Sequence, residues 1–93
     1  MHYLYILYSK KIDRFYVGET PDIDLRVNLH NSHYFKKSFT NSSSDWEIVL
    51  DKRCKDRGEA LYLENFIKRM KSKKFIEKII VDPKILDDIV HKR

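Results

Sequence analysis

The chain has 93 residues, a formal net charge of +5, 42% hydrophobic residues and 13% aromatic residues. This length predicts one domain, and the apolar fraction is that of an ordinary globular protein, which excludes a largely disordered chain. No apolar run approaches the ~20 residues that a membrane-spanning helix needs, and we expect no signal peptide because charged residues soon follow the apolar start. Cys54 is the one cysteine, which excludes an internal disulfide and a thiolate metal cluster and favours a reducing, cytoplasmic setting.

The N-terminal part of the chain predicts a β-hairpin. Residues 2–8 are aromatic and β-branched, as is typical of a buried strand, and residues 15–19 are expected to form the return strand. Gly18 weakens that second strand and therefore marks a bulge or a place where another group comes close.

A first helix is expected over residues 23–31, after a helix-start signal that contains proline. Leu25 and Leu29 are four residues apart and are expected to face the core. Arg26 and His30 have the same spacing, so they share an adjacent stripe of this helix.

The rest of the chain predicts one more strand and three helices. After a long polar connection over 33–45, residues 46–50 alternate as a third strand, and helices are expected over 59–70, 72–81 and 85–91. The order β-β-α-β-α-α-α predicts an α+β layer fold, in which helices flank a small three-stranded antiparallel sheet. The core stripe expected of the helix over 59–70 is Ala60, Leu63, Phe66, Ile67 and Met70.

Positive charge is concentrated in residues 68–78, which hold six Lys or Arg and one Glu. Such a patch favours a polyanion, either nucleic acid or an anionic membrane surface, although an ordinary solvated helix face is the alternative. The candidate nucleic-acid-binding residues are Lys36, Lys37, Lys68, Arg69, Lys71, Lys73 and Lys74.

Three other polar residues have two interpretations each. Glu64 lies at the edge of the apolar stripe of its helix, where a carboxylate needs a partner. That partner is either a lysine or arginine, or a divalent cation such as Mg²⁺ or Mn²⁺. Arg26 and His30 are either surface residues, or a donor to phosphate and a group that moves a proton at neutral pH.

Tyrosines crowd the two N-terminal strands. The ordinary explanation is aromatic packing with hydroxyls at the rim of the core. A catalytic role needs a hydroxyl near a phosphate and also a nearby cation, because a free phenol has a pKa of about 10. The tyrosines concerned are Tyr3, Tyr5, Tyr8 and Tyr16.

In this order and spacing, the residues resemble the motifs of the GIY-YIG nuclease superfamily. Tyr3-Leu4-Tyr5 and Tyr16-Val17-Gly18 resemble its paired motif. Arg26 and His30 match its R-x-x-x-H pattern, and Glu64 matches its metal-binding glutamate. The resemblance covers roughly residues 2–75 and is close to the small stand-alone bacterial members related to the nuclease domain of UvrC. It implies one domain over 1–93 with a helical extension over about 73–93.

The resemblance implies hydrolysis of a phosphodiester bond with one divalent cation, Mg²⁺ or Mn²⁺, held by Glu64. It implies that Arg26 stabilises charge on the phosphate and that Tyr5 orients the site. It also implies that Tyr16 activates or orients water with help from His30, and the family leaves room for the reverse assignment of these two roles. The expected substrate is nucleic acid, specifically DNA in repair or recombination, and no membrane partner is expected. These five residues should converge on one open concave surface.

One residue departs from the family's pattern. Glu19 follows Gly18, where several characterised members have lysine, and this places a carboxylate near the expected phosphate path. The alternative to an endonuclease is therefore a nucleic-acid-binding module of the same fold with weak or no catalysis. A structural domain that dimerises through its tyrosine strands is a third hypothesis, and the oligomeric state is not fixed by the sequence.

Overall fold

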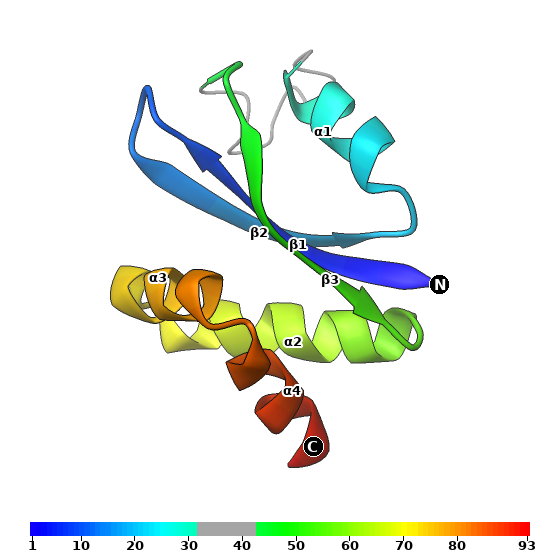
Figure 1. The fold of residues 1–93 in the computed structure, drawn as a ribbon. Helices are drawn as coiled ribbons and strands as arrows, with labels where there is room; N and C mark the ends of the chain where they lie inside the picture. The colour runs from blue at the N-terminus through cyan, green and yellow to red at the C-terminus, as the bar shows by residue number, and fades with distance from the viewer. Residues whose placement is uncertain (32–42) are drawn as a thin grey trace.

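The computed structural model describes residues 1–31 and 43–93, and its centre is a three-stranded antiparallel sheet in the order β2-β1-β3 (Figure 1). The strands are β1 (His2–Ser9), β2 (Arg14–Thr20) and β3 (Glu47–Cys54). The predicted hairpin is confirmed: β1 and β2 pair so that Tyr5 lies opposite Gly18 and Leu7 opposite Tyr16. β3 extends further than the predicted strand over 46–50 and pairs with the other edge of β1.

The helices of the described residues lie on both faces of this sheet. α1 covers one face, and α2, α3 and α4 gather on the other (Figure 1). This arrangement confirms the predicted α+β architecture. No helix within residues 1–31 and 43–93 is long and apolar enough to cross a lipid bilayer. The helices are α1 (Ile23–Asn31), α2 (Arg57–Met70), α3 (Lys73–Val81) and α4 (Lys84–His91).

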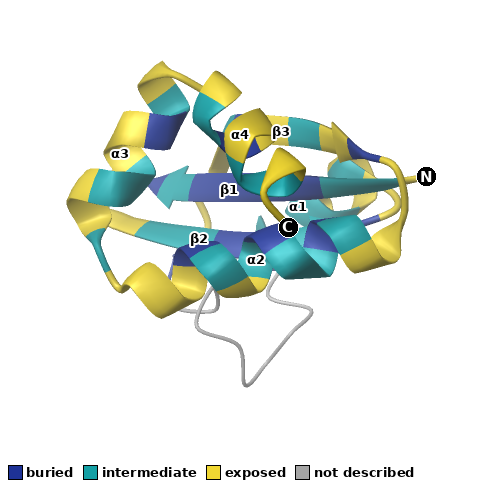
Figure 2. Cartoon of the chain, turned by 90° about the horizontal axis from the view of Figure 1, so that it is seen from below, coloured by how far each residue is buried: buried dark blue, intermediate teal, exposed yellow. Residues whose placement is uncertain are grey.

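The central strand β1 is buried on both faces, as its dark blue length in Figure 2 shows. Side chains alternate across a strand, so Leu4 and Ile6 face the three helices while Tyr5 and Leu7 face α1. The first pair joins the larger core, and the second packs with Trp46 in a smaller cluster. The tyrosine motif of β1 is therefore part of the α1 side of the sheet.

Two predicted core stripes need correction. On α1, Leu25 is 55% exposed and Leu29 is half-buried, whereas Ile23 and Val27 pack against the smaller cluster. The inward stripe of α1 runs through these two residues to His30, because the i, i+4, i+7 positions share a helix face. On α2, Ala60, Leu63 and Ile67 are buried as predicted, while Phe66 is half-buried and Met70, the last residue of the helix, is 47% exposed.

Hydrogen bonds fix α1 against the sheet. The side-chain oxygen of Asn31 accepts a hydrogen bond from the Trp46 backbone N–H at 2.8 Å, and its amide nitrogen donates to the Trp46 carbonyl at 3.0 Å. Because Asn31 ends α1 and Trp46 precedes β3, this pair closes the connection between the two elements. The result is that Arg26 and His30 are held over the tyrosine side of the hairpin.

Candidate active site

Tyr5 is enclosed between the hairpin and α1. It is 1% exposed, and its hydroxyl lies 3.1 Å from Nε2 of His30. Gly18 lies opposite, and a Cβ atom at that position would be 2.6 Å from the Tyr5 hydroxyl oxygen and 2.7 Å from Cζ. The close approach predicted at Gly18 is therefore that of the Tyr5 ring. It is a matter of space alone, because Gly18 has no positive φ.

His30 projects from α1 into the same enclosed layer and is buried. Burial, and then the positive charge of Arg26, lower the pKa of His30 to about 4, so the imidazole is neutral at neutral pH. A neutral imidazole has one donor and one acceptor nitrogen, so its tautomer decides which way the hydrogen bond to Tyr5 runs. Arg26 lies one turn earlier and is half-buried.

Tyr16 lies above this layer on β2 and is half-buried. Its ring centroid is 4.8 Å from that of His30 and 6.2 Å from that of Tyr5. The pKa of Tyr5 is raised chiefly by burial and then by the charge of Tyr16, while Arg26 opposes the rise. Tyr5 therefore keeps its proton, and Tyr16 presents the more accessible of the two hydroxyls.

Glu64 reaches this region from α2, along the outer edge formed by β2. Its Oε2 atom pairs with Nζ of Lys68 at 2.8 Å, and the same Nζ lies 5.9 Å from the Tyr16 ring centroid. The negative charge of Glu64 also contributes to the raised pKa of Tyr5. The carboxylate is thus paired with a lysine, as one interpretation of the sequence expected, but the pair faces the tyrosines.

The five predicted residues therefore meet in two layers. Tyr5 and His30 are buried below Tyr16, so the expectation that all of them line one open surface is wrong for these two. The reason is that β1 is the central strand and α1 closes over it, while β2 is an edge strand. Arg26 and Glu64 lie within electrostatic reach of the Tyr5 hydroxyl.

The side chains around Tyr16 offer the Glu64 carboxylate as a ligand for a divalent cation. Within the described residues, no group of three or more His, Cys, Asp or Glu is placed to hold a metal ion. Mg²⁺ nevertheless keeps several waters and takes one or two carboxylates together with substrate phosphate. Glu64 fits such a site, because its side chain is 16% exposed and its partner Lys68 is half-exposed, so the lysine can be exchanged for another cation.

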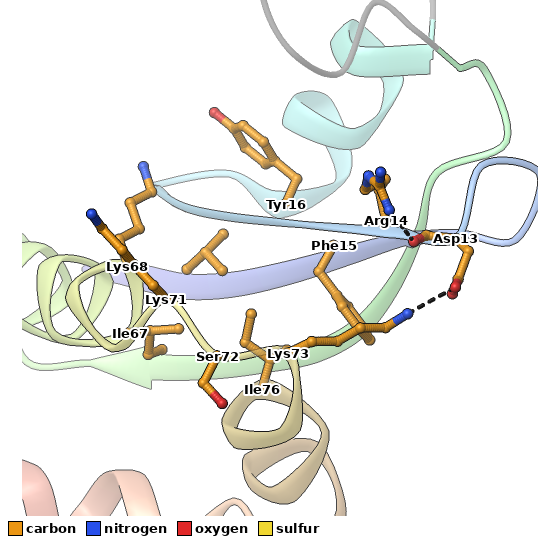
Figure 3. A pocket seen from close by; sticks show the side chains of 11 residues that line it. Asp13, Arg14, Phe15, Tyr16, Ile67, Lys68, Lys71, Ser72, Lys73 and Ile76 are labelled. Atoms are coloured by element: carbon orange, nitrogen blue, oxygen red, sulfur yellow. Dashed lines mark hydrogen bonds and ion pairs between the residues drawn. The ribbon is translucent and has the colours of Figure 1, made fainter.

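The predicted nucleic-acid-binding residues separate into groups. Lys68, Lys71 and Lys73 line a pocket beside Tyr16 (Figure 3), whereas Arg69 lies over the Phe66 ring. Lys74 is exposed on α3 and is not among the residues that line this pocket. Two of the predicted residues, Lys36 and Lys37, lie outside the described residues.

Arg14 also lines the pocket and was not predicted. A signal for it exists in the sequence, since Arg14 lies two residues before Tyr16. Side chains two apart on a strand share a face, so an arginine at that spacing on an edge strand shares the face of Tyr16.

Glu19 does not occupy the position that the sequence suggested. It lies opposite Leu4 in the hairpin and so faces the α2 side of the sheet. There its carboxylate lies 3.5 Å from Nε2 of His2 and 3.6 Å from Nε of Arg57. Its negative charge still adds a small contribution to the raised pKa of Tyr5, so it is separated from the site by the sheet but remains electrostatically coupled to it.

Comparison with known proteins agrees with the resemblance. The model of the GIY-YIG catalytic domain matches residues 1–78, a span that includes the hairpin, α1 and all of α2. Searches of curated proteins and of solved structures gave no match.

Proposed function

Because the chain belongs to the GIY-YIG catalytic domain family, a family of nucleases, we propose that it is a metal-dependent endonuclease that hydrolyses DNA phosphodiester bonds in repair or recombination. The observation that supports this best is the line of contacts from His30 through Tyr16 and Lys68 to Glu64. It joins a neutral imidazole, a phenol, a cation and a carboxylate at one edge of the sheet. Together these groups can orient a water molecule, neutralise a phosphate and hold a divalent cation.

Glu64 is the residue that we propose as the metal ligand. A divalent cation bound there would polarise the phosphate and stabilise the negative charge on the leaving oxygen. Without substrate, the Lys68 ammonium is paired with the Glu64 carboxylate. If the cation replaced Lys68 at Glu64, the ammonium would be available to bind the phosphate.

Arg26 is the proposed donor to the phosphate. A guanidinium has a fixed set of N–H donors that suits phosphate oxygens, and it stays charged at every accessible pH. The same charge helps to keep His30 neutral and lowers the pKa of Tyr5. These two effects support placing Arg26 over the tyrosine layer rather than facing bulk solvent.

Tyr16 is the proposed group that orients and activates the attacking water. With a pKa of about 4, His30 is a poor proton acceptor at neutral pH, and its Nε2 is already bonded to Tyr5. The roles left to His30 and Tyr5 are to position Tyr16, whose ring packs on both. This favours Tyr16 over His30 as the residue that orients and activates the attacking water.

The experiment is a cleavage assay on branched, nicked and single-stranded DNA with Mg²⁺ or Mn²⁺. Glu64→Gln and Arg26→Ala should each reduce cutting by about 100-fold or more, the range seen when one transition-state contact is removed. Tyr16→Phe should lose a similar amount, because general acid–base groups contribute about 10²–10⁴-fold. Glu77→Gln, an exposed carboxamide substitution on α3, is the matched control and should cut normally.

The alternative hypothesis, a module that binds nucleic acid without cutting it, predicts binding without cleavage. If the parent chain binds these DNAs without cutting any of them, and Glu64→Gln and Arg26→Ala bind as well as the parent, the nuclease proposal is wrong. Cutting that survives without a divalent cation would remove the role given to Glu64.

A further inference from the structure

A pocket of about 400 Å³ lies beside the site and is not used by the proposed chemistry. It lies between β2 and the junction of α2 with α3, and Tyr16 forms part of its wall (Figure 3). Its volume is within the range of pockets that hold small organic ligands, about 300–1,000 Å³. The question is which ligand its surface suits.

The pocket has two chemically distinct parts. Its walls are mostly apolar, and aromatic and aliphatic side chains from β2, α2 and α3 contribute to them: Phe15, Val17, Ile67 and Ile76. Among the described residues that line it, four are cationic and one is a carboxylate. The cations are Arg14, Lys68, Lys71 and Lys73, and the carboxylate is Asp13.

A nucleotide has the same two parts, a flat base that prefers an apolar surface and a phosphate that prefers cations. A purely apolar ligand matches only one of them. An anionic lipid has both, and we favour the nucleotide because the chain belongs to a nuclease family. The carboxylate does not cancel the charge, because Asp13 is paired with Lys73 at 2.8 Å and accepts a hydrogen bond from Tyr8 at 2.7 Å. Lys68 is paired with Glu64 outside the pocket, so Arg14 and Lys71 carry the excess of positive charge around it.

The turn that carries the cations between α2 and α3 is held in place. Lys71 adopts a left-handed conformation with φ of 48°, and its N–H bonds to the Lys68 carbonyl. Ser72 then begins α3 by accepting a hydrogen bond from the Phe75 N–H at 3.1 Å. The ion pair of Lys73 with Asp13 ties the same turn to the hairpin, so the rim is preformed.

Lys68 connects the pocket to the site. It lines the pocket, pairs with Glu64 and lies over the Tyr16 ring, so a phosphate bound beside Lys68 is next to Glu64 and Tyr16. A base within a duplex cannot enter an apolar pocket, because it is stacked and paired on its neighbours. Only an unpaired base can enter.

We infer that this pocket binds one unpaired nucleotide of the DNA strand that is cut, next to the cleaved bond, an inference that rests on the proposed function. The base lies against the apolar walls, and the phosphate is held by Lys68 and Lys71, which lie at the same end of the pocket (Figure 3). The pocket then selects branched or bulged DNA over a continuous duplex without reading its sequence.

The test is a binding assay that needs no turnover, with the Glu64→Gln protein. Two duplexes are compared by fluorescence anisotropy at one salt concentration, the first with a single-thymidine bulge and the second with an abasic nucleotide in the same bulge. Both keep the phosphate, so only the base differs. We expect the thymidine bulge to bind about tenfold more tightly, within the range for stacking one base on protein side chains.

Two tryptophan substitutions on α3 locate the effect. Ile76 lines this pocket, so Ile76→Trp should fill it and reduce the preference to near onefold. Ile80 lines a neighbouring hollow near Tyr8, so Ile80→Trp is the matched control and should keep the preference. Equal binding of the two bulges by the Glu64→Gln protein would overturn the inference. So would a preference that Ile76→Trp retains or that Ile80→Trp also loses.

The outcomes for the pocket and for the nuclease can be told apart. Base-dependent binding by a parent chain that cuts no DNA would refute the endonuclease but keep the nucleotide pocket. Metal-dependent cutting that is equally fast at thymidine and abasic bulges, with equal binding, would keep the endonuclease and refute the pocket.

Discussion

Gly18 offers the sharpest test of the layer below Tyr16. Its α-carbon faces the side chain of Tyr5, and a methyl group there would meet the hydroxyl oxygen at 2.6 Å and two ring carbons at 2.7 and 3.0 Å. The ring has nowhere to move easily, because Tyr5 is fully enclosed and hydrogen-bonded to His30. Because Gly18 has no positive φ, alanine is acceptable to the backbone, and a loss of stability in Gly18→Ala comes from the ring contact.

Overpacking of this kind costs about 1–3 kcal/mol of unfolding free energy. For a domain of this size, each kcal/mol lowers Tm by roughly 4–8 °C, so thermal unfolding followed by circular dichroism resolves it. Gly58→Ala is the control, because the nearest atoms to its Cβ would be at 3.4 and 3.7 Å and alanine is the better helix former. That variant should be as stable as the parent or gain up to about 1 kcal/mol.

A double-mutant cycle assigns the cost to the ring. Leucine at position 5 lacks the Cζ and hydroxyl atoms that the new methyl group would meet. In the Tyr5→Leu background, Gly18→Ala should therefore be almost without cost, and the coupling energy should equal the loss seen in the parent. A Gly18→Ala protein as stable as the parent, or one equally destabilised in both backgrounds, would refute the packing that we describe.

Three further predictions concern charge. The pKa of His30 is about 4 in the folded chain and near 6.5 when unfolded, so the unfolded state binds more protons between these values, and stability should fall as pH drops from about 6.5 to about 4. Urea unfolding should show this component, at most ~1.4 kcal/mol per pH unit, and His30→Gln should lack it. Glu19→Gln should cut DNA at a rate within about twofold of the parent and change the unfolding free energy by less than about 1 kcal/mol, because the ion pairs of Glu19 are long and face α2. A tenfold gain in cutting would instead place Glu19 at the phosphate path. Lys68→Gln should reduce the slope of log binding constant against log salt by about 0.9, whereas Lys84→Gln, on α4, should leave it unchanged.

The fold was largely predictable because its elements are marked by local patterns. The aromatic and β-branched N-terminus predicted β1, and the bounds of α1 were predicted without error. The buried face of α1 was not predicted. Leu25 and Leu29 form an apolar pair equal in number to Ile23 and Val27, and the inward stripe ends on the polar side chain of His30. A helix whose buried face carries a histidine has little amphipathic signal, so only packing against Tyr5 reveals it.

The sequence predicted that the candidate residues lie near the hairpin, but it did not predict how deeply each of them is buried. Spacing along the chain indicated which side chains would meet, since Arg26, His30 and Glu64 all approach the hairpin. Spacing carries no information on which strand is central, and this decides that Tyr5 is enclosed while Tyr16 is not. The pocket could not be predicted from the sequence for the same reason, because it exists only where the edge of β2 meets the turn between α2 and α3.

The two motif tyrosines show why depth matters for the chemistry. Tyr5 and Tyr16 are both phenols, one on each strand of the hairpin, and the sequence gives no reason to expect that they ionise differently. Burial raises the pKa of Tyr5, and its hydroxyl is committed to His30, so it can hold a neighbour in place but cannot give up its proton to solvent. Tyr16 lies on the edge strand, between His30 below and Lys68 above, where a phosphate and water can approach. Tyr5 lies on the central strand and Tyr16 on the edge strand. This difference is why we assign Tyr5 a positioning role and place Tyr16 against the attacking water.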